Sequence, residues 1–97
     1  MRIITKETLQ AFWIENPRAE QALKSWYAEA CSAHWRTPDD VKEKYGSASI
    51  ISNNRVVFNI CGNKYRLVVY IAYQIGWIYI RFIGTHKEYD KIDAEGI

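Results

Sequence analysis

The sequence predicts an α+β fold, with an N-terminal strand and two to three helices packed on one face of a small antiparallel sheet. Helical periodicity is confined to the first half of the chain, whereas strongly β-prone runs fill the second half. These runs are joined by short turns, which favours an antiparallel meander. The 97 residues, of which 48% are hydrophobic and 25% charged, suit a single globular domain spanning residues 1–97.

Three helices are expected after a β-prone opening at residues 1–5: residues 6–15, 17 to about 33, and 38 to about 45. Thr5, Asn16 and Thr37 stand where N-caps are expected, and Pro17 and Pro38 follow at the first helical position. The first two helices carry apolar stripes that should face the sheet: Leu9, Phe12, Trp13, Ala19, Ala22, Leu23, Trp26, Tyr27 and Ala30.

The remaining strands are expected over residues 47–52, 56–60, 65–73 and 77–85. Alternation along the last two predicts one set facing the helices: Leu67, Val69, Ile71, Ile78, Ile80 and Phe82. The opposite, open face then carries a second set: Arg66, Tyr70, Tyr79 and Arg81. Guanidinium groups beside aromatic rings suit phosphates and unstacked bases, although packing or solubility also explains such residues.

Charge is distributed unevenly along the chain. Residues 44–87 contain 6 Lys or Arg and no carboxylate, whereas residues 88–97 carry a net charge of −3. A basic, acid-free sheet is typical of a protein that binds a phosphate backbone, and Arg55 and Lys64 are therefore expected to join the RNA-binding face. The alternative is that strands disfavour acidic residues and that these bases are solvated edge residues.

The last strand leads directly into a polar cluster that holds His86, Lys87, Tyr89 and Asp90. Metal-independent RNA cleavage requires a base for the 2′-hydroxyl proton, an acid for the departing 5′-oxygen, and a cation at the phosphorus. His86 suits either proton transfer, Asp90 suits orienting His86 or acting as base, and Tyr89 suits stacking or proton transfer. Lys87 and Arg66 supply positive charge. The alternative to a catalytic role is that these residues form an ordinary polar helical turn.

The two cysteines, Cys31 and Cys61, lack the spacing of a metal site, so neither a metal nor another cofactor is expected. Free thiols fit a reducing compartment, although one disulfide remains compatible with the sequence. The apolar hairpin is too short for a membrane helix, and no signal peptide is evident. We therefore expect a cytoplasmic protein without a membrane partner.

Two segments carry a resemblance to a known family: NKYRLVVYI, residues 63–71, and IRFIGTHKEYDKI, residues 80–92. Together with the order of elements, they resemble the HigB branch of the RelE-type toxins over nearly the whole chain. Arg66 matches the strand arginine of that family, and Tyr89 its C-terminal tyrosine. Many RelE-type toxins carry lysines where this chain has Val57 and Asn59, and Lys64 is the nearest substitute.

The resemblance implies a RelE-like fold and a toxin of a type II toxin–antitoxin system that cleaves mRNA on the ribosome. It also implies neutralisation by a HigA-type helix-turn-helix antitoxin, through which alone the toxin would reach operator DNA. Two alternatives remain open from the sequence. One is a non-catalytic RNA- or ribosome-binding domain, and the other is a ParE-like toxin directed at gyrase.

Overall fold

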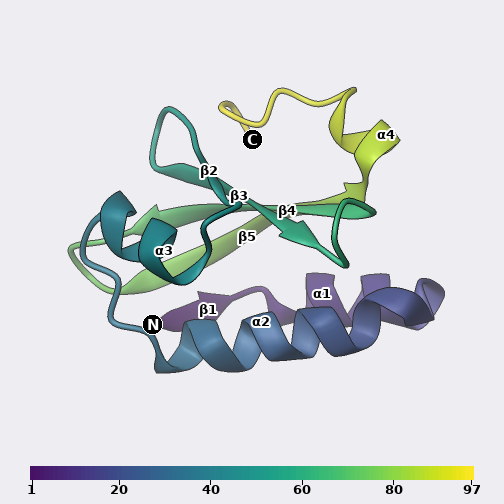
Figure 1. Ribbon diagram of the computed structural model, residues 1–97, viewed down its shortest axis with the longest axis horizontal. Helices are drawn as coiled ribbons and strands as arrows, with labels where there is room; N and C mark the ends of the chain where they lie inside the picture. The colour runs from purple at the N-terminus through teal and green to yellow at the C-terminus, as the bar shows by residue number, and fades with distance from the viewer.

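The computed structural model describes residues 1–97, and its two longest helices lie on one side of a five-stranded sheet (Figure 1). The elements, in chain order, are β1 (Arg2–Ile4), α1 (Lys6–Glu15), the 3-10 helix η1 (Pro17–Ala19), α2 (Glu20–Ser32), α3 (Pro38–Lys44), β2 (Ser49–Ile50), β3 (Arg55–Ile60), β4 (Tyr65–Ala72), β5 (Trp77–Thr85) and α4 (His86–Tyr89). The α+β class is confirmed.

The strand order is β1-β5-β4-β3-β2, so β2 to β5 form the expected antiparallel meander. β1 is the exception, because it pairs parallel to β5 with Ile3 opposite Ile78. The chain reaches β5 from β1 only after the three helices, which is the long connection that a parallel pair needs. The sheet is therefore mixed, with its single parallel pair at one edge.

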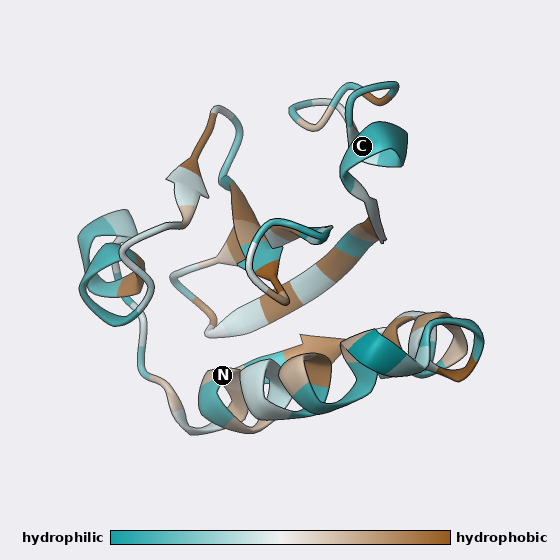
Figure 2. Ribbon diagram, turned by 45° about the vertical axis from the view of Figure 1, so that its right-hand side comes forward, coloured by the Kyte–Doolittle hydropathy of each residue, from teal (hydrophilic) through white to brown (hydrophobic).

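One core of 17 buried residues joins α1, α2 and α3 to one face of the sheet. Leu9 and Leu23 are fully buried from the helix side, as are Leu67 and Ile71 from the sheet side. Burying such aliphatic side chains contributes about 1.5–3 kcal/mol each. Apolar residues lie on the central strands, while α4 is hydrophilic (Figure 2).

Two expected N-caps are wrong. Thr5 lies in the left-handed region with φ 68°, and its hydroxyl donates to the Ile80 backbone oxygen at 3.4 Å instead of capping α1. The Asn16 side chain donates backwards to the Phe12 oxygen at 3.1 Å, so it closes α1 and does not open the next helix. Thr37 does cap α3, in a capping box with Asp40.

The predicted orientation of Phe82 is also wrong, because a β-bulge interrupts the β4–β5 ladder. Val68 lies opposite Phe82, whereas the next residue, Val69, lies opposite Ile80, which leaves Arg81 as the extra residue. Neighbouring residues of a strand point to opposite faces, so the bulge turns Phe82 away from the helices. The other apolar residues predicted to face the helices on these two strands lie in the main core.

The face away from the helices is only partly open. Residues 90–97, here called the C-terminal strap, run back over this face (Figure 1). Val57, Val68 and Ala94 form a small buried cluster there, with a further partly buried set packed against it: Ile51, Phe82, Tyr89, Ile92 and Ile97. Val68, on the face away from the helices, is therefore fully covered.

Candidate active site

Six of the predicted site residues lie at one end of the sheet, where the β3–β4 turn, the start of β4 and α4 meet. We call this set the rim: Lys64, Arg66, His86, Lys87, Tyr89 and Asp90. The backbone N–H of His86 donates to the Lys64 oxygen at 3.2 Å, and Arg66 on β4 lies opposite Gly84 on β5. No cavity is lined by a rim residue, so a substrate at the rim lies on an open surface.

A capping box fixes the start of α4. The Thr85 hydroxyl accepts from the Glu88 backbone N–H at 3.2 Å, and the Glu88 carboxylate accepts from the Thr85 N–H at 2.7 Å. These reciprocal bonds satisfy backbone donors at a helix end that otherwise have no partner. The helical turn that the sequence offered as an alternative is therefore present, and it places His86 and Lys87 next to the end of β5.

His86 and Asp90 lie one helical turn apart, and His86 Nδ1 is 3.1 Å from Asp90 Oδ2. A carboxylate is an acceptor only, so this bond places a proton on Nδ1 and leaves Nε2 of the neutral ring as an acceptor. Both side chains are more than half exposed, at 53% and 58%. The pair therefore combines a fixed tautomer with access from solvent.

Arg66 is half-buried and is held by the turn that precedes it. Its guanidinium donates to the Asn63 side-chain oxygen at 3.1 Å and to the Asn63 backbone oxygen at 3.3 Å. It forms no salt bridge, so its positive charge has no carboxylate partner in the protein. Asn63 lies in the β3–β4 turn, and nothing in the sequence pattern marks it as the residue that positions Arg66.

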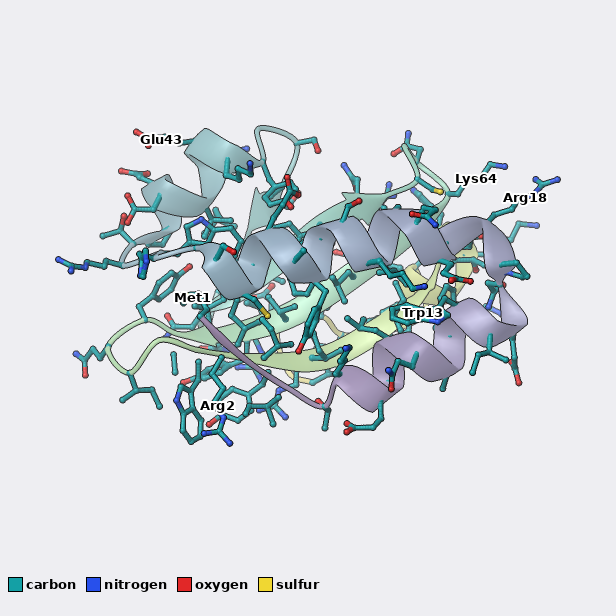
Figure 3. The ribbon with its side chains drawn as sticks, turned by 90° about the horizontal axis from the view of Figure 1, so that it is seen from below. Met1, Arg2, Trp13, Arg18, Glu43 and Lys64 are labelled. Atoms are coloured by element: carbon teal, nitrogen blue, oxygen red, sulfur yellow. The ribbon has the colours of Figure 1, made fainter.

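Lys64 and Lys87 are exposed and make no side-chain hydrogen bond. Tyr89 is half-buried, and its ring packs against the cluster beneath the strap while its hydroxyl has no partner in the protein. Arg18 of η1 lies at the same end of the molecule as Lys64 (Figure 3). The Cys61 thiol donates to the Arg18 oxygen at 3.1 Å, which fixes η1 against the β3–β4 turn and adds a cation that the sequence did not indicate.

A second group lies further along the same face. Tyr70 and Tyr79 have ring centroids 5.8 Å apart, and Arg81 lies 5.7 and 5.4 Å from the two rings. Two residues not singled out from the sequence extend the series, since Trp77 lies 6.1 Å from Tyr79 and Arg2 lies 5.1 Å from Trp77. A cation that lies over an aromatic ring is attracted to it. Together with Arg55, these residues form a series across four strands, here called the aromatic platform.

Arg55 lies on this face, as expected, with its guanidinium 5.0 Å from the centre of the Tyr70 ring. The same guanidinium is hydrogen-bonded to the strap. It donates to the backbone oxygens of Ile97 and Asn53. The strap therefore lies between the rim and the aromatic platform. From Arg66 to Tyr70 along β4, the two are about 13 Å apart, at a rise of about 3.3 Å per residue.

The strongest effects on pKa lie away from the rim, between α2 and α3. Burial and a hydrogen bond to Glu29 raise the pKa of the Tyr45 hydroxyl, while that same hydrogen bond lowers the pKa of the Glu29 carboxyl. Burial also raises the pKa of Tyr73. No three His, Cys, Asp or Glu side chains are grouped as metal ligands, and no helix is long and apolar enough to cross a membrane.

Known proteins resemble this chain over most of its length. A family model described as HigB_toxin, the RelE-like toxic component of a toxin–antitoxin system, matches residues 19–92. The chain is 27% identical over 96 residues to the mRNA interferase toxin HigB of Escherichia coli K12 and to the mRNA interferase HigB of Shigella flexneri. The matched segment covers 97% of this chain and 92% of each relative. The mRNA interferase HigB of Escherichia coli O6:H1 is 26% identical over 94 residues, which cover 95% of this chain and 91% of that relative.

An α+β fold that ends in a basic rim, together with the match over residues 19–92, defines a RelE-like toxic component of a toxin–antitoxin system. The chain belongs to the HigB toxin family. Membership implies an antitoxin as its partner. It confirms the resemblance on which the sequence prediction rested.

Proposed function

We propose that this protein is a ribosome-dependent, metal-independent mRNA endoribonuclease whose active site is the rim. The observation that carries the proposal is the His86–Asp90 pair, which lies at the same end of an acid-free sheet as Arg66, a cation without a carboxylate partner. Similarity to proteins named mRNA interferase HigB supports the same reading.

In this mechanism, Nε2 of His86 accepts the proton of the 2′-hydroxyl, and Asp90 stabilises the resulting imidazolium. The 2′-oxygen attacks the adjacent phosphorus as the bond from phosphorus to the 5′-oxygen breaks. Arg66 and Lys87 stabilise the negative charge that develops on the phosphoryl oxygens. Tyr89 donates the proton to the departing 5′-oxygen, which leaves a 2′,3′-cyclic phosphate and a 5′-hydroxyl end.

The aromatic platform supports RNA binding as part of the same function. Tyr70, Tyr79 and Arg81 can stack with unpaired bases and contact phosphates, and Lys64 extends the positive surface at the rim. The same platform favours a second candidate, which is a protein that binds RNA or the ribosome without cutting. Cleavage distinguishes the two.

In the cell, we propose that residues 1–97 act as one RelE-like domain in the cytoplasm. A HigA-type helix-turn-helix antitoxin neutralises it, and the toxin reaches operator DNA only within that complex. Gel retardation of operator DNA by the complex, with none by the toxin alone, would support this arrangement.

The test is induced expression of the wild type beside Arg66→Ala and Tyr89→Phe, followed by mapping of new RNA ends. We expect growth arrest and cleavage of translated mRNA for the wild type, and a loss of cleavage of about 100-fold or more in each variant. Elemental analysis should find no bound metal in the purified toxin, and treating the toxin alone with EDTA beforehand should leave its cleavage on translating ribosomes unchanged. Binding without new RNA ends favours the non-catalytic candidate, and inhibition of supercoiling favours a gyrase-directed toxin.

A further inference from the structure

A cavity of about 420 Å³ lies at the end of β4 opposite the rim, and no residue named so far as catalytic lines it. It lies between the β4–β5 turn and the segment before α3, and is lined mainly by Arg36, Asn54, Tyr70, Tyr73, Gln74 and Ile75. Its size falls in the range of pockets that hold small ligands. A second cavity of about 250 Å³ is adjacent, because Arg36, Tyr73, Gln74 and Ile75 line both.

The polar side chains of this cavity are not used by the protein itself. The Arg36 guanidinium makes no hydrogen bond and no salt bridge, although its backbone N–H donates to Asp40. Asn54 and Gln74 are exposed, and their amide groups have no hydrogen-bond partner in the protein. Each amide offers both donors and an acceptor, which is the pattern needed to read the edge of a nucleobase.

The aromatic side of the cavity is shared with the platform. Tyr70 lines the cavity and also carries the guanidinium groups of Arg55 and Arg81 at 5.0 and 5.7 Å. A base that stacks on Tyr70 would thus lie close to both cations, in a cavity that the two free amides also line. Burial raises the pKa of the Tyr73 hydroxyl, and the negative charge of Asp40 raises it further. The Asp40 carboxylate accepts hydrogen bonds from the backbone N–H groups of Arg36 and Thr37.

We propose that this cavity binds one unpaired nucleotide of the message, several positions away from the bond that the rim cuts. The inference rests on the proposed function and adds a specificity-determining site to it. Arg36 contacts the phosphate, Tyr70 stacks with the base, and Asn54 and Gln74 read its edge. The distance of about 13 Å between Arg66 and Tyr70 along β4 corresponds to about four stacked nucleotides at about 3.4 Å each.

The experiment uses the full chain and two readouts. Adenosine, guanosine, cytidine and uridine 5′-monophosphates are titrated into the toxin, made non-cleaving by Arg66→Ala, while the side-chain amide signals of Asn54 and Gln74 are followed by NMR. Cleavage sites of the active toxin are mapped for wild type, Arg36→Ala, Gln74→Ala and the control Gln21→Ala. Gln21 is an exposed glutamine on α2, remote from the cavity lining.

We expect one nucleotide to shift both amide signals, and Arg36→Ala to weaken its binding about 10-fold or more. Gln74→Ala should relax the base preference at one fixed position relative to the cut, with Gln21→Ala unchanged. Unshifted amide signals and unaltered cleavage patterns, in a wild type that still cuts mRNA, overturn the cavity proposal and leave the proposed function intact. A wild type that cuts no RNA overturns the proposed function instead, and nucleotide titration alone then decides whether the cavity binds nucleotides.

Discussion

The guanidinium of Arg55 is bound to the backbone oxygen of Ile97, with Nε 3.0 Å from that oxygen. A residue expected to contact RNA therefore also fastens the C-terminal strap over the sheet. The Asn53 side chain adds a second tie, since it donates to the Glu95 oxygen at 3.2 Å. These bonds hold the acidic C-terminal strap between the rim and the aromatic platform.

Arg55→Gln should loosen the strap. The variant loses the bonds to Ile97, and a typical net loss is about 1 kcal/mol of unfolding free energy for each hydrogen bond removed. Hydrogen exchange of residues 91–97 should accelerate while exchange in the main core stays slow. Arg81→Gln is the matched control, because Arg81 touches the same Tyr70 ring but makes no bond to the strap. Equal exchange in both variants would show that Arg55 does not fasten the strap.

His86→Gln should lower mRNA cleavage by about 100-fold or more without unfolding the protein, because glutamine cannot accept the 2′-hydroxyl proton. Asp90→Asn should cause a smaller loss, since it keeps an acceptor near Nδ1 but removes the negative charge that stabilises the imidazolium. Single-turnover cleavage on translating ribosomes measures both, with Glu95→Gln as a control for a lost acid on the strap. Full activity in His86→Gln would exclude His86 as the base.

Gly84→Ala should destabilise the protein by about 1–3 kcal/mol. A Cβ at this position would lie 2.6 Å from the Phe82 ring and 2.9 Å from the Glu88 carboxylate, so the Phe82 ring and the capping box of α4 would have to shift. Chemical denaturation measures the change. Gly46→Ala is the control, because a Cβ there meets no atom within 4 Å, and its unfolding free energy should stay close to that of the wild type.

Asp40→Asn should flatten the loss of stability at acid pH. Hydrogen bonds from the Arg36 and Thr37 backbone N–H groups, at 2.9 and 3.2 Å, lower the pKa of the Asp40 carboxyl below its ordinary value of 3.8. A carboxyl with a lowered pKa in the folded state stabilises the protein above the ordinary pKa, and this contribution is lost as pH falls through the folded value.

Denaturation between about pH 5 and pH 2 tests this, since the wild type should lose more stability over that window than Asp40→Asn. Asp39→Asn is the control, because Asp39 is exposed and makes no hydrogen bond to the start of α3. A wild-type slope equal to that of Asp40→Asn would mean that the capping box contributes nothing on the acid side.

Local patterns in the sequence determined the class of fold. The apolar stripes of α1 and α2 and the alternation on β4 depend on the geometry of single elements, and burial of Leu9, Leu23, Leu67 and Ile71 bears them out. The resemblance of residues 63–71 and 80–92 likewise depended on sequence alone, and the family match confirms it. Thr37 was recognisable as a cap because the residues that it needs are its neighbours.

Contacts between distant segments were decided only by the tertiary structure. The bulge at Arg81 depends on how two strands align, so nothing within β5 predicted that Phe82 would face the strap. Three further features depend on tertiary neighbours. They are the parallel pairing of β1 with β5, the hydrogen bond from Arg66 to Asn63, and the place of Trp77 and Arg2 in the aromatic platform. The sequence alone determined which side chains are available to contact RNA, whereas the tertiary structure decided which of them lie together. The reason is that packing around a shared core brings together residues that are distant in the chain, and local sequence patterns do not specify such pairs.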